Sequence, residues 1–567
     1  MSLTLIAIAV VVILTLGYTL YGQLVARQYA LDDSRTTPAV QVNDGVDFVP
    51  TKRFFLLGQH FSAIAAAGPI AGPIIACQLF GWGPSLLWIA LGVVFIGAVH
   101  DFSALVASVR HKARSIAEIV KENLGRNAWL AILAFIWIAL VYLIIAFADI
   151  TAATFVGKTE ELEGAMPFNK GGAVAFASTA YLLLSIVMGL VQRKWDPPLW
   201  LMTVIFVPAT LVAVWAGTQF STLLIAGQNT WSVTIMIYCF IASLLPVWML
   251  LQPRGYLGGF VLYMALAVGL IGIFFGGFEI KQPMTTAAPA FGLAGSALPF
   301  LFVTIACGAC SGFHGLVASG TTSKQIAKES DCKPVGYGGM LLEGFVAVIA
   351  LATIMIVAPE LSKGVAPGRI YGDGIASFLT VLIGKDAFLF AATFGAMAFS
   401  TFVFDTLDVA TRLGRYILQE LSNRHGPTAA AVATGITAAV PAVVLVAAGP
   451  GGYRTFWTLF GTSNQLLAAL TLLAVSVWLH RSGKRYWFTF APMLFLMVIT
   501  LWSLVGQTIQ FAKAASAATG SAVIPPVANA TVAVLLFVLT AFLVAESARA
   551  FGRPPAEAAQ PETRAAA

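Results

Sequence analysis

Ionisable side chains stand inside several long apolar runs of this sequence, where a charge is costly and usually has a function or a partner. His100 and Asp101 are adjacent in "GAVHDFSALVAS", Glu343 lies in "LLEGF" and Asp405 lies in "FSTFVFDTLDVATRLGRY". Such groups at membrane depth are typical of proton or cation relays. For Asp405 and Glu343, coupling or substrate contact and structural hydrogen bonding stay open as alternatives. Neighbouring residues point about 100° apart on a helix, so we expect His100 and Asp101 each to need a partner from another helix.

Three other polar sites have simpler interpretations. Asp408 and Arg412 are four residues apart, which places them on one helical face and predicts an ion pair near the membrane boundary. Asp149 stands near the end of its apolar run, from which a carboxylate can reach outward to water. His60 stands near the start of its run, and we expect it at the membrane interface.

The stretch "AAAGPIAGPII" interrupts an apolar run with two Gly-Pro steps, Gly68-Pro69 and Gly72-Pro73. A single Gly or Pro in a membrane helix is commonly a tolerated kink or a close helix contact. Two steps four residues apart predict about one unwound turn, because each Pro removes a backbone donor and frees a carbonyl. Freed backbone groups survive in a membrane only where they face protein or a water-filled cavity.

A second apolar run is also interrupted. Its sequence "TIACGACSGFHGLVASGTT", residues 304–322, contains Gly308, Ser311, Gly312 and a mid-run His314. The histidine stands in the break itself, where protonation near neutral pH can link the binding of a substrate to that of a proton. We therefore expect both breaks to line one substrate site.

The composition identifies the elements that must position these residues. Of the 567 residues, 59% are hydrophobic and 10% are charged, which excludes a soluble globular protein and indicates an all-α, polytopic membrane protein. The net charge of +7 indicates loops facing anionic lipid rather than a nucleic-acid surface. Five scattered cysteines indicate neither a disulfide framework nor a metal site, and no cofactor is implied.

Apolar runs of membrane-crossing length predict about 15 spans. They are 3–22, 54–80, 84–108, 128–151, 171–191, 199–216, 230–250, 257–277, 295–323, 336–358, 387–411, 427–448, 455–479, 486–510 and 528–549. The segment 374–383 is too short to span, and we expect it at a surface. The tail 550–567 is rich in Ala, Pro and Glu and reads as disordered.

Lys and Arg concentrate in alternate linkers, which include "RHKARS", "QRKWD", "QPRGY", "SKQIAKESDCK", "TRLGRY" and "HRSGKR". Because short cytoplasmic loops carry the positive charge, this alternation places the N-terminus outside and the C-terminus in the cytoplasm. The spans 54–80 and 295–323 then run in opposite directions, as an inverted repeat requires. Two interrupted spans at corresponding positions are the sequence sign of a secondary transporter's binding site.

Several sequence blocks resemble, in order, those of the carbon-starvation protein A family of bacterial inner-membrane transporters. They are "GPIAGPIIACQLFGWGPSLLWIALGVVFIGAVHDFSAL" (68–105), "WMLLQPRGYL" (248–257), "FSTFVFDTLDVATRLGRYILQE" (399–420) and "LFGTSNQLLAAL" (459–470). The resemblance covers roughly residues 50–480. It implies uptake of pyruvate or peptides during nutrient limitation, the pyruvate carriers being proton symporters.

The resemblance also implies a core like that of the leucine transporter, an inverted repeat with two broken helices. In that arrangement Ser400 and Thr401 supply hydroxyls to a sodium site facing carbonyls near Gly68, and Asp405 can bind a proton instead. Seven spans rather than five separate the breaks here. Gly255 also stands where the family block "QPRDYL" leads us to expect an acidic residue.

We therefore expect a secondary transporter that imports a small carboxylate, pyruvate or a short peptide, together with H⁺ or Na⁺. The expected regions are 1–53 (first span and cytoplasmic loop), 54–294 (first repeat with extra spans), 295–480 (second repeat), 481–549 (terminal spans) and the tail 550–567. A channel and an intramembrane enzyme are the alternatives. A channel usually shows a filter motif, and an enzyme needs clustered catalytic groups near one membrane face. The polar cluster Thr462 to Gln465 suits either interhelical hydrogen bonding or substrate contact.

Overall fold

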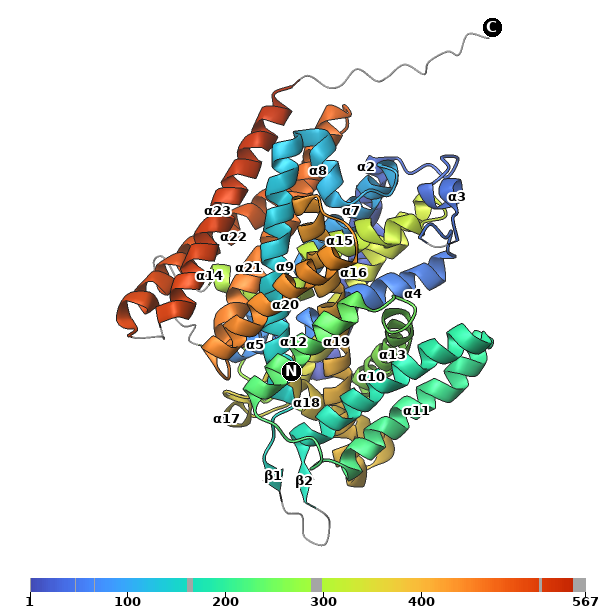
Figure 1. The fold of residues 1–567 in the computed structure, drawn as a ribbon, viewed down its shortest axis with the longest axis vertical. Coiled ribbons are helices and arrows are strands. Elements are labelled where there is room, and N and C mark those ends of the chain that lie inside the picture. Colours follow the sequence, from blue (N-terminus) through green and yellow to red (C-terminus); the bar gives the residue numbers. More distant parts are fainter. Residues whose placement is uncertain are drawn as a thin grey trace.

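The computed structural model describes residues 2–45, 47–65, 67–160, 167–286, 298–519 and 523–553, and it is a bundle of membrane-length helices (Figure 1). Within these residues, 13 helices are long and apolar enough to cross a membrane, and a bent pair makes a fourteenth candidate. The predicted all-α, polytopic class is confirmed. The sequence predicts a disordered tail, and its residues from 554 onward lie outside the part of the chain that the structure describes.

The helices follow one another with short connections. Their bounds are α1 (Leu3–Leu16), α2 (Gly22–Tyr29), α3 (Pro38–Val42), α4 (Arg53–Ile64), α5 (Gly68–Phe80), α6 (Trp82–Gly92), α7 (Ala98–Arg110), α8 (Ile116–Leu124), α9 (Arg126–Thr154), α10 (Lys170–Trp195), α11 (Leu199–Gln219), α12 (Gln228–Leu244), α13 (Leu251–Phe275), α14 (Leu298–Ile305), α15 (Gly312–Gly320), α16 (Gly339–Met355), α17 (Pro359–Ser362), α18 (Pro367–Ile383), α19 (Phe388–Ser422), α20 (Pro427–Ala448), α21 (Tyr453–Arg481), α22 (Trp487–Ala517) and α23 (Ile524–Phe551). The short strands β1 (Thr159–Glu160) and β2 (Phe168–Asn169) pair antiparallel.

Some helices are enclosed by the others, and some form the rim. The most apolar stretch of α21 is 94% buried, whereas those of α11 and α23 are each 28% buried. Large apolar side chains on α11, such as Val204 and Trp215, are exposed. In a membrane protein such faces contact lipid. The helices α7, α15, α16 and α21 therefore form the interior in which functional side chains can be sealed from lipid.

The first interrupted span is the bent pair α4 and α5. Their axes differ by 47°. Helix α5 begins at Gly68, so Pro69 lies in its first turn and Pro73 lies inside it. The predicted unwinding over the two Gly-Pro steps is therefore wrong, because the bend lies before Gly68. A Pro in the first turn costs little, since the N–H that it lacks would have no helical partner there.

The second interrupted span is broken as predicted. Helix α14 ends at Ile305, a 3₁₀ turn follows, and α15 begins at Gly312. Ala306 takes a left-handed conformation with φ of 40°. The α-helix is thus interrupted at the predicted place, around Gly308.

The two broken spans run antiparallel. Facing residues pair in opposite order along the chain, namely His60 with Thr322, Gly68 with Cys307 and Gly72 with Ile305. Their opposite directions agree with the sequence analysis. The repetition of the surrounding halves and the five region boundaries remain predictions.

The short segment 374–383 is buried in its first half and exposed at its end, where Val381, Leu382 and Ile383 are 43%, 56% and 45% exposed. It is the second half of α18, which packs against α13, α16 and α19. Ile375 and Phe378 are fully buried, and a Cβ on Gly374 would clash with Thr353 of α16. Helix α18 starts seven residues before this segment, and among the described residues it is not one of the helices long and apolar enough to cross a membrane, as the short apolar run predicted.

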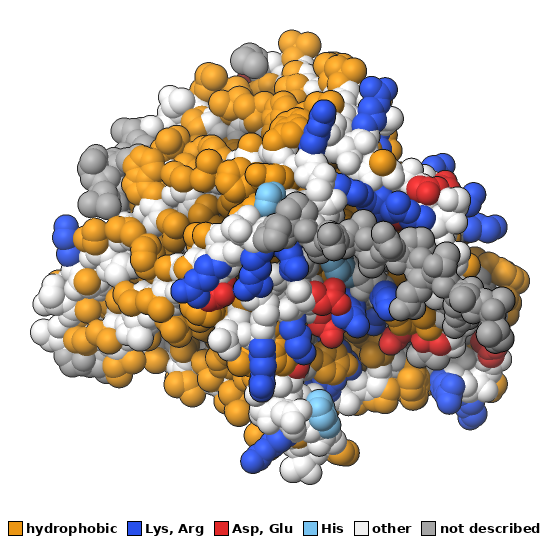
Figure 2. Space-filling view, turned by 90° about the horizontal axis from the view of Figure 1, so that it is seen from above, with side chains coloured by type: hydrophobic (Ala, Val, Ile, Leu, Met, Phe, Trp, Pro, Cys, Tyr) orange, Lys and Arg blue, Asp and Glu red, His pale blue; other side chains and the backbone are white. Residues whose placement is uncertain are grey.

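One end of the bundle is rich in basic side chains. Lys and Arg gather on the face seen from above, the end that carries α2, α3 and α8 (Figures 1 and 2). Two of the connections at this end are tied together, because Arg110 and Arg35 both contact Glu329, at 2.9 Å and 3.8 Å. We call this end the basic face.

Candidate functional site

Four titratable residues meet beside the second break, and we call them the His314 centre. His314 Nδ1 lies 2.9 Å from Asp101 Oδ2, and His314 Nε2 lies 3.2 Å from Glu343 Oε2. His100 Nδ1 lies 2.7 Å from the second Asp101 oxygen, Oδ1. The imidazole of His314 therefore bridges two carboxylates, which come from α7 and α16. All four side chains are at most 1% exposed.

His100 and Asp101 were each expected to need a partner from another helix. Asp101 has one, His314 of α15, whereas His100 Nδ1 contacts Asp101 itself. The backbone directions of neighbouring residues do diverge on a helix, but both side chains turn toward α15 and meet there. Gly315 makes room for this arrangement. A Cβ at that position would lie 3.2 Å from His100 Cε1, a tight contact.

The break that carries His314 is held open by Asn464 of α21. Asn464 Nδ2 donates to Ser311 Oγ at 3.0 Å and to Cys307 Sγ at 3.2 Å. Its Oδ1 accepts from the backbone N–H of Phe313 at 3.0 Å. The amide thus caps the first turn of α15, where a backbone donor would otherwise lack a helical partner.

The neighbours of Asn464 in the polar cluster join helices to one another. Gln465 Nε2 donates to the carbonyl of Phe302, and Gln507 Nε2 donates to Thr462 Oγ1 at 2.6 Å. Of the two alternatives for this cluster, interhelical hydrogen bonding is therefore what the described contacts support.

The glycines and prolines predicted to form a substrate site do lie together. A Cβ on Gly72 would lie 2.6 Å from the Ile305 carbonyl oxygen, and one on Gly308 would lie 3.5 Å from Pro69 Cα. A Cβ on Gly68 would likewise clash with Cys307 Sγ. Pro73 is buried in α5, one turn after Pro69. The absence of side chains lets α5 and α14 approach backbone to backbone.

A small pocket adjoins the second break. It has a cavity volume of about 10 Å³ and is lined by α9, α15 and α21. Phe313 and Asn464 contribute side chains from the break itself, and Leu140 and Leu143 contribute from α9. We call it the inner pocket. Its lining is apolar apart from the Asn464 amide.

A second buried charge cluster was missed by the sequence analysis, and we call it the Arg254 cluster. Arg254 is fully buried, and its Nε donates to Asp405 Oδ1 at 2.7 Å. Its Nη1 contacts Asp408 Oδ2, the Tyr238 hydroxyl and the Phe404 carbonyl oxygen. The sequence analysis assigned the motif "QPRGY" to a basic loop facing the cytoplasm. That assignment is wrong for Arg254, which lies buried in α13. The nearby carboxylates on α19 were the signal that a buried cation was required.

The predicted ion pair of Asp408 with Arg412 is also wrong. Asp408 pairs with Arg254, while Arg412 Nη2 donates to the carbonyls of Ala242 and Leu245 at 2.9 Å each. The two side chains leave α19 toward different neighbours, because a fully buried carboxylate gains more from an enclosed guanidinium. Asp405 therefore belongs to this cluster rather than to the breaks.

The hydroxyls expected at a sodium site lie elsewhere. Ser400 Oγ is 2.7 Å from Ser178 Oγ on α10, and it donates to the Met397 carbonyl oxygen at 2.9 Å. Thr401 lies beside Gly258 of α13. The described contacts of Ser400 and Thr401 thus point toward α10 and α13 rather than toward the backbone near Gly68.

The two residues placed near membrane boundaries are buried instead. Asp149 Oδ1 accepts from Gln228 Nε2 at 2.7 Å, and Oδ2 accepts from the backbone N–H of Tyr453 at 2.6 Å. It therefore holds the start of α21 rather than reaching to water. His60 is 1% exposed, and its Nδ1 lies 2.9 Å from Thr322 Oγ1.

A many-helix membrane protein with broken, antiparallel spans around a sealed titratable centre is a membrane transporter in architecture, and comparison with known proteins agrees. The sequence profile of carbon starvation protein CstA matches residues 1–373 and 362–503. The chain belongs to this family. Its relatives are named as transporters, so the chain has a transport role and is not an enzyme.

Two relatives illustrate the family. The peptide transporter CstA of Campylobacter jejuni is 34% identical over 572 residues, which cover 88% of this chain and 79% of the relative. The pyruvate/proton symporter BtsT of Escherichia coli is 30% identical over 594 residues, which cover 88% and 81%. Among solved structures, a mutant manganese transporter of Eremococcus coleocola is similar with a TM-score of 0.46, 14% identity, and coverage of 90% of this chain and 99% of that one.

Proposed function

We propose that this protein imports a small carboxylate-bearing nutrient together with a proton across the bacterial inner membrane during nutrient limitation. The observation that carries the proposal is the His314 centre, in which four titratable side chains from three helices meet at a break in a membrane span. Burial of ionisable groups at membrane depth is costly, so such groups are a functional hypothesis by default. The names of the relatives supply the substrate classes, pyruvate and peptides.

The geometry of the centre supports binding of one further proton. His314 Nδ1 is hydrogen-bonded to Asp101, and its Nε2 lies 3.2 Å from Glu343 Oε2. With His314 doubly protonated and both carboxylates ionised, the three groups together carry one net negative charge. Neither Glu343 oxygen has a hydrogen-bond partner among the described residues, and we assign the further proton to this carboxylate.

We favour pyruvate over a peptide because the wall of the inner pocket is apolar. The amide of its polar lining residue, Asn464, is already bonded to Ser311, Cys307 and Phe313. The pocket lining contains no carboxylate that could receive the amino group of a peptide. The first turn of α15 contributes Phe313 to the lining, and its backbone N–H donates to Asn464 Oδ1.

The orientation follows from the charge of the ends. The basic face, which carries α2, α3 and α8, faces the cytoplasm in this proposal, since cytoplasmic loops are enriched in Lys and Arg. The N-terminus is then outside and the C-terminus inside. Solute enters from the opposite face and leaves beside the basic face.

The test is uptake of labelled pyruvate by proteoliposomes that contain the purified protein. We expect saturable uptake that an imposed inward proton gradient accelerates and that collapse of the gradient abolishes, with or without sodium. Unlabelled di- and tripeptides should compete weakly. Uptake that does not saturate, or that ignores the proton gradient, refutes the symporter. Strong peptide competition makes peptides the substrate, and dependence on sodium alone makes Na⁺ the coupling ion.

A further inference from the structure

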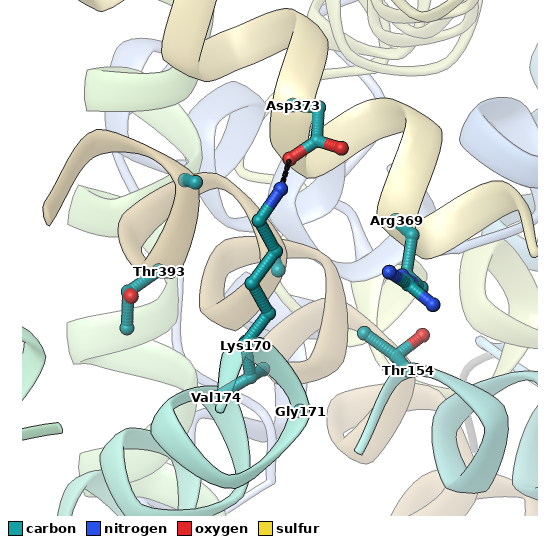
Figure 3. Close-up of a pocket in the computed structure, with 9 residues that line it drawn as sticks. Thr154, Lys170, Gly171, Val174, Arg369, Asp373 and Thr393 are labelled. Atoms are coloured by element: carbon teal, nitrogen blue, oxygen red, sulfur yellow. Dashed lines mark ion pairs between the residues drawn. The ribbon is translucent and has the colours of Figure 1, made fainter. Parts of the chain in front are cut away.

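A second pocket lies at the end opposite to the basic face and is lined by charged side chains (Figure 3). It has a cavity volume of about 20 Å³ and lies between the end of α9, the start of α10, and helices α18 and α19. Lys170, the first residue of α10, points across it to Asp373 of α18, with Nζ 3.5 Å from Oδ1. Thr154 and Arg369 face the same space. We call it the outer pocket.

The charges of the outer pocket do not balance. Two cations, Lys170 and Arg369, face one carboxylate, Asp373. The guanidinium of Arg369 has no ion pair or hydrogen bond among the described residues, although it stands four residues before Asp373 on one helical face. Thr154 and Thr393 add hydroxyls to the lining. A solute with one negative charge completes this set, and Arg is the residue that best binds a carboxylate by two parallel donors.

One face of α9 connects the outer pocket to the breaks. Thr154 lines the outer pocket, and Leu143, Leu140 and Ile136 line the inner pocket. Phe147 stands between them at the spacing of the same helical face. From Thr154 to Leu143 the rise along the helix is about 16 Å.

An aromatic layer separates the two pockets along this face. The ring of Phe147 lies 6.0 Å from that of Trp457 and 5.2 Å from that of Phe460, measured between centroids. Phe147 also borders the first break, since a Cβ on Gly68 would lie 3.8 Å from its Cζ. Phe460 itself lines the inner pocket. A solute that moves along α9 thus passes the meeting point of the two broken spans.

We propose that the outer pocket is the first binding site for the solute's carboxylate, with Arg369 and Lys170 as its ligands, and that the solute passes from it along α9 to the inner pocket. This inference rests on the proposed carboxylate import. Asp373 holds Lys170 in place while the pocket is empty and competes with the solute for it. The layer of Phe147, Trp457 and Phe460 keeps the two pockets apart in the present conformation.

The experiment measures pyruvate uptake kinetics of three pocket variants in proteoliposomes. Arg369→Gln and Lys170→Gln should each raise KM about tenfold, because each removes a charge-assisted contact, while the maximal rate and the response to the proton gradient stay unchanged. Asp373→Asn should lower KM, since it removes the competing carboxylate. Lys385→Gln is the matched control, because it removes an exposed charge in the α18–α19 linker outside the pocket.

The outcomes separate this inference from the proposed function. An unchanged KM in both cation variants, with gradient-driven uptake intact, overturns the outer site and leaves the symporter standing. A higher KM in Asp373→Asn also overturns it, because a damaged pocket rather than a lost competitor then explains all three variants. An equal rise of KM in Lys385→Gln shows general surface attraction instead. Absence of gradient-driven uptake in the unaltered protein overturns the proposed function itself.

Discussion

Arg254 and Asp405 stand 151 residues apart in sequence and form an ion pair of 2.7 Å between α13 and α19. The same guanidinium contacts Asp408, so a single cation compensates two carboxylates. Arg254→Met should therefore destabilise the protein by about 3–5 kcal/mol, because it leaves both carboxylates without their cation. Thermal unfolding of the detergent-solubilised protein, followed by loss of monodispersity, measures the effect.

Arg412→Met is the matched control for that variant. Its guanidinium donates to two backbone carbonyls rather than to a carboxylate, so its removal should cost less. Asp405→Asn should also be milder than Arg254→Met, since Asp408 still pairs with the guanidinium. Equal unfolding temperatures for Arg254→Met and the unaltered protein would show that the cluster does not support the fold.

The His314 centre predicts which carboxylate couples the proton. Glu343→Gln should leave pyruvate exchange across the membrane intact but remove its acceleration by a proton gradient, because the amide cannot take up the further proton. Glu360→Gln, at an exposed carboxylate in α17, should behave as the unaltered protein. Uptake measured with and without the gradient gives the comparison. A gradient response that survives in Glu343→Gln places the coupling proton elsewhere.

Close packing of the broken spans predicts a large effect at one glycine. Gly72→Ala should destabilise the protein by about 1–3 kcal/mol, because the added Cβ would lie 2.6 Å from the Ile305 carbonyl oxygen. Gly255→Ala should stabilise α13 by up to about 1 kcal/mol, since nothing lies within 4 Å of the added carbon. The unfolding temperatures of the two variants should move in opposite directions. A shift in the same direction would contradict the close backbone contact between α5 and α14 at Gly72.

The ion pairs of Glu329 with Arg110 and Arg35 at the basic face predict that a change at Glu329 alters mobility locally. Glu329 accepts from Arg110 and from the backbone N–H of Asp32, at 2.9 Å and 3.0 Å. Glu329→Gln should loosen this end by about 2–5 kcal/mol, because it leaves the nearly buried Arg110 without its counter-charge. Hydrogen exchange of residues 27–35 should then be faster, with exchange in α21 unchanged. Uniformly faster exchange would indicate general destabilisation instead.

Fold class and both broken spans could be predicted from the sequence, because apolar runs of membrane length and their interruptions are local features. The location of the first bend could not be predicted, since it depends on which helix Pro69 joins. The close contact at Gly72 likewise depends on α14, which lies more than 200 residues away in the sequence. The residues around Gly72 do not indicate which distant segment packs against them.

The candidate site was predicted in part. His100, Asp101, His314 and Glu343 were each identified by depth, yet their meeting depends on three helices that only the folded chain brings together. Arg254 was missed because a charge count treats any Arg between two apolar runs as part of a loop. Two carboxylates on a buried helix face were evidence for such a cation, and that rule is usable in other sequences.

In the proposed symport, the single proton taken up by the His314 centre determines how the membrane voltage acts on transport. One proton and one monocarboxylate cancel, so in this proposal the loaded carrier has the charge of the empty one and pyruvate import is electroneutral. A zwitterionic peptide with the same proton moves one positive charge inward, which 100 mV favours by about 2.3 kcal/mol. A potassium diffusion potential imposed on the proteoliposomes should therefore leave pyruvate uptake unchanged and accelerate only a peptide. The voltage dependence of uptake thus distinguishes pyruvate from a peptide as the substrate.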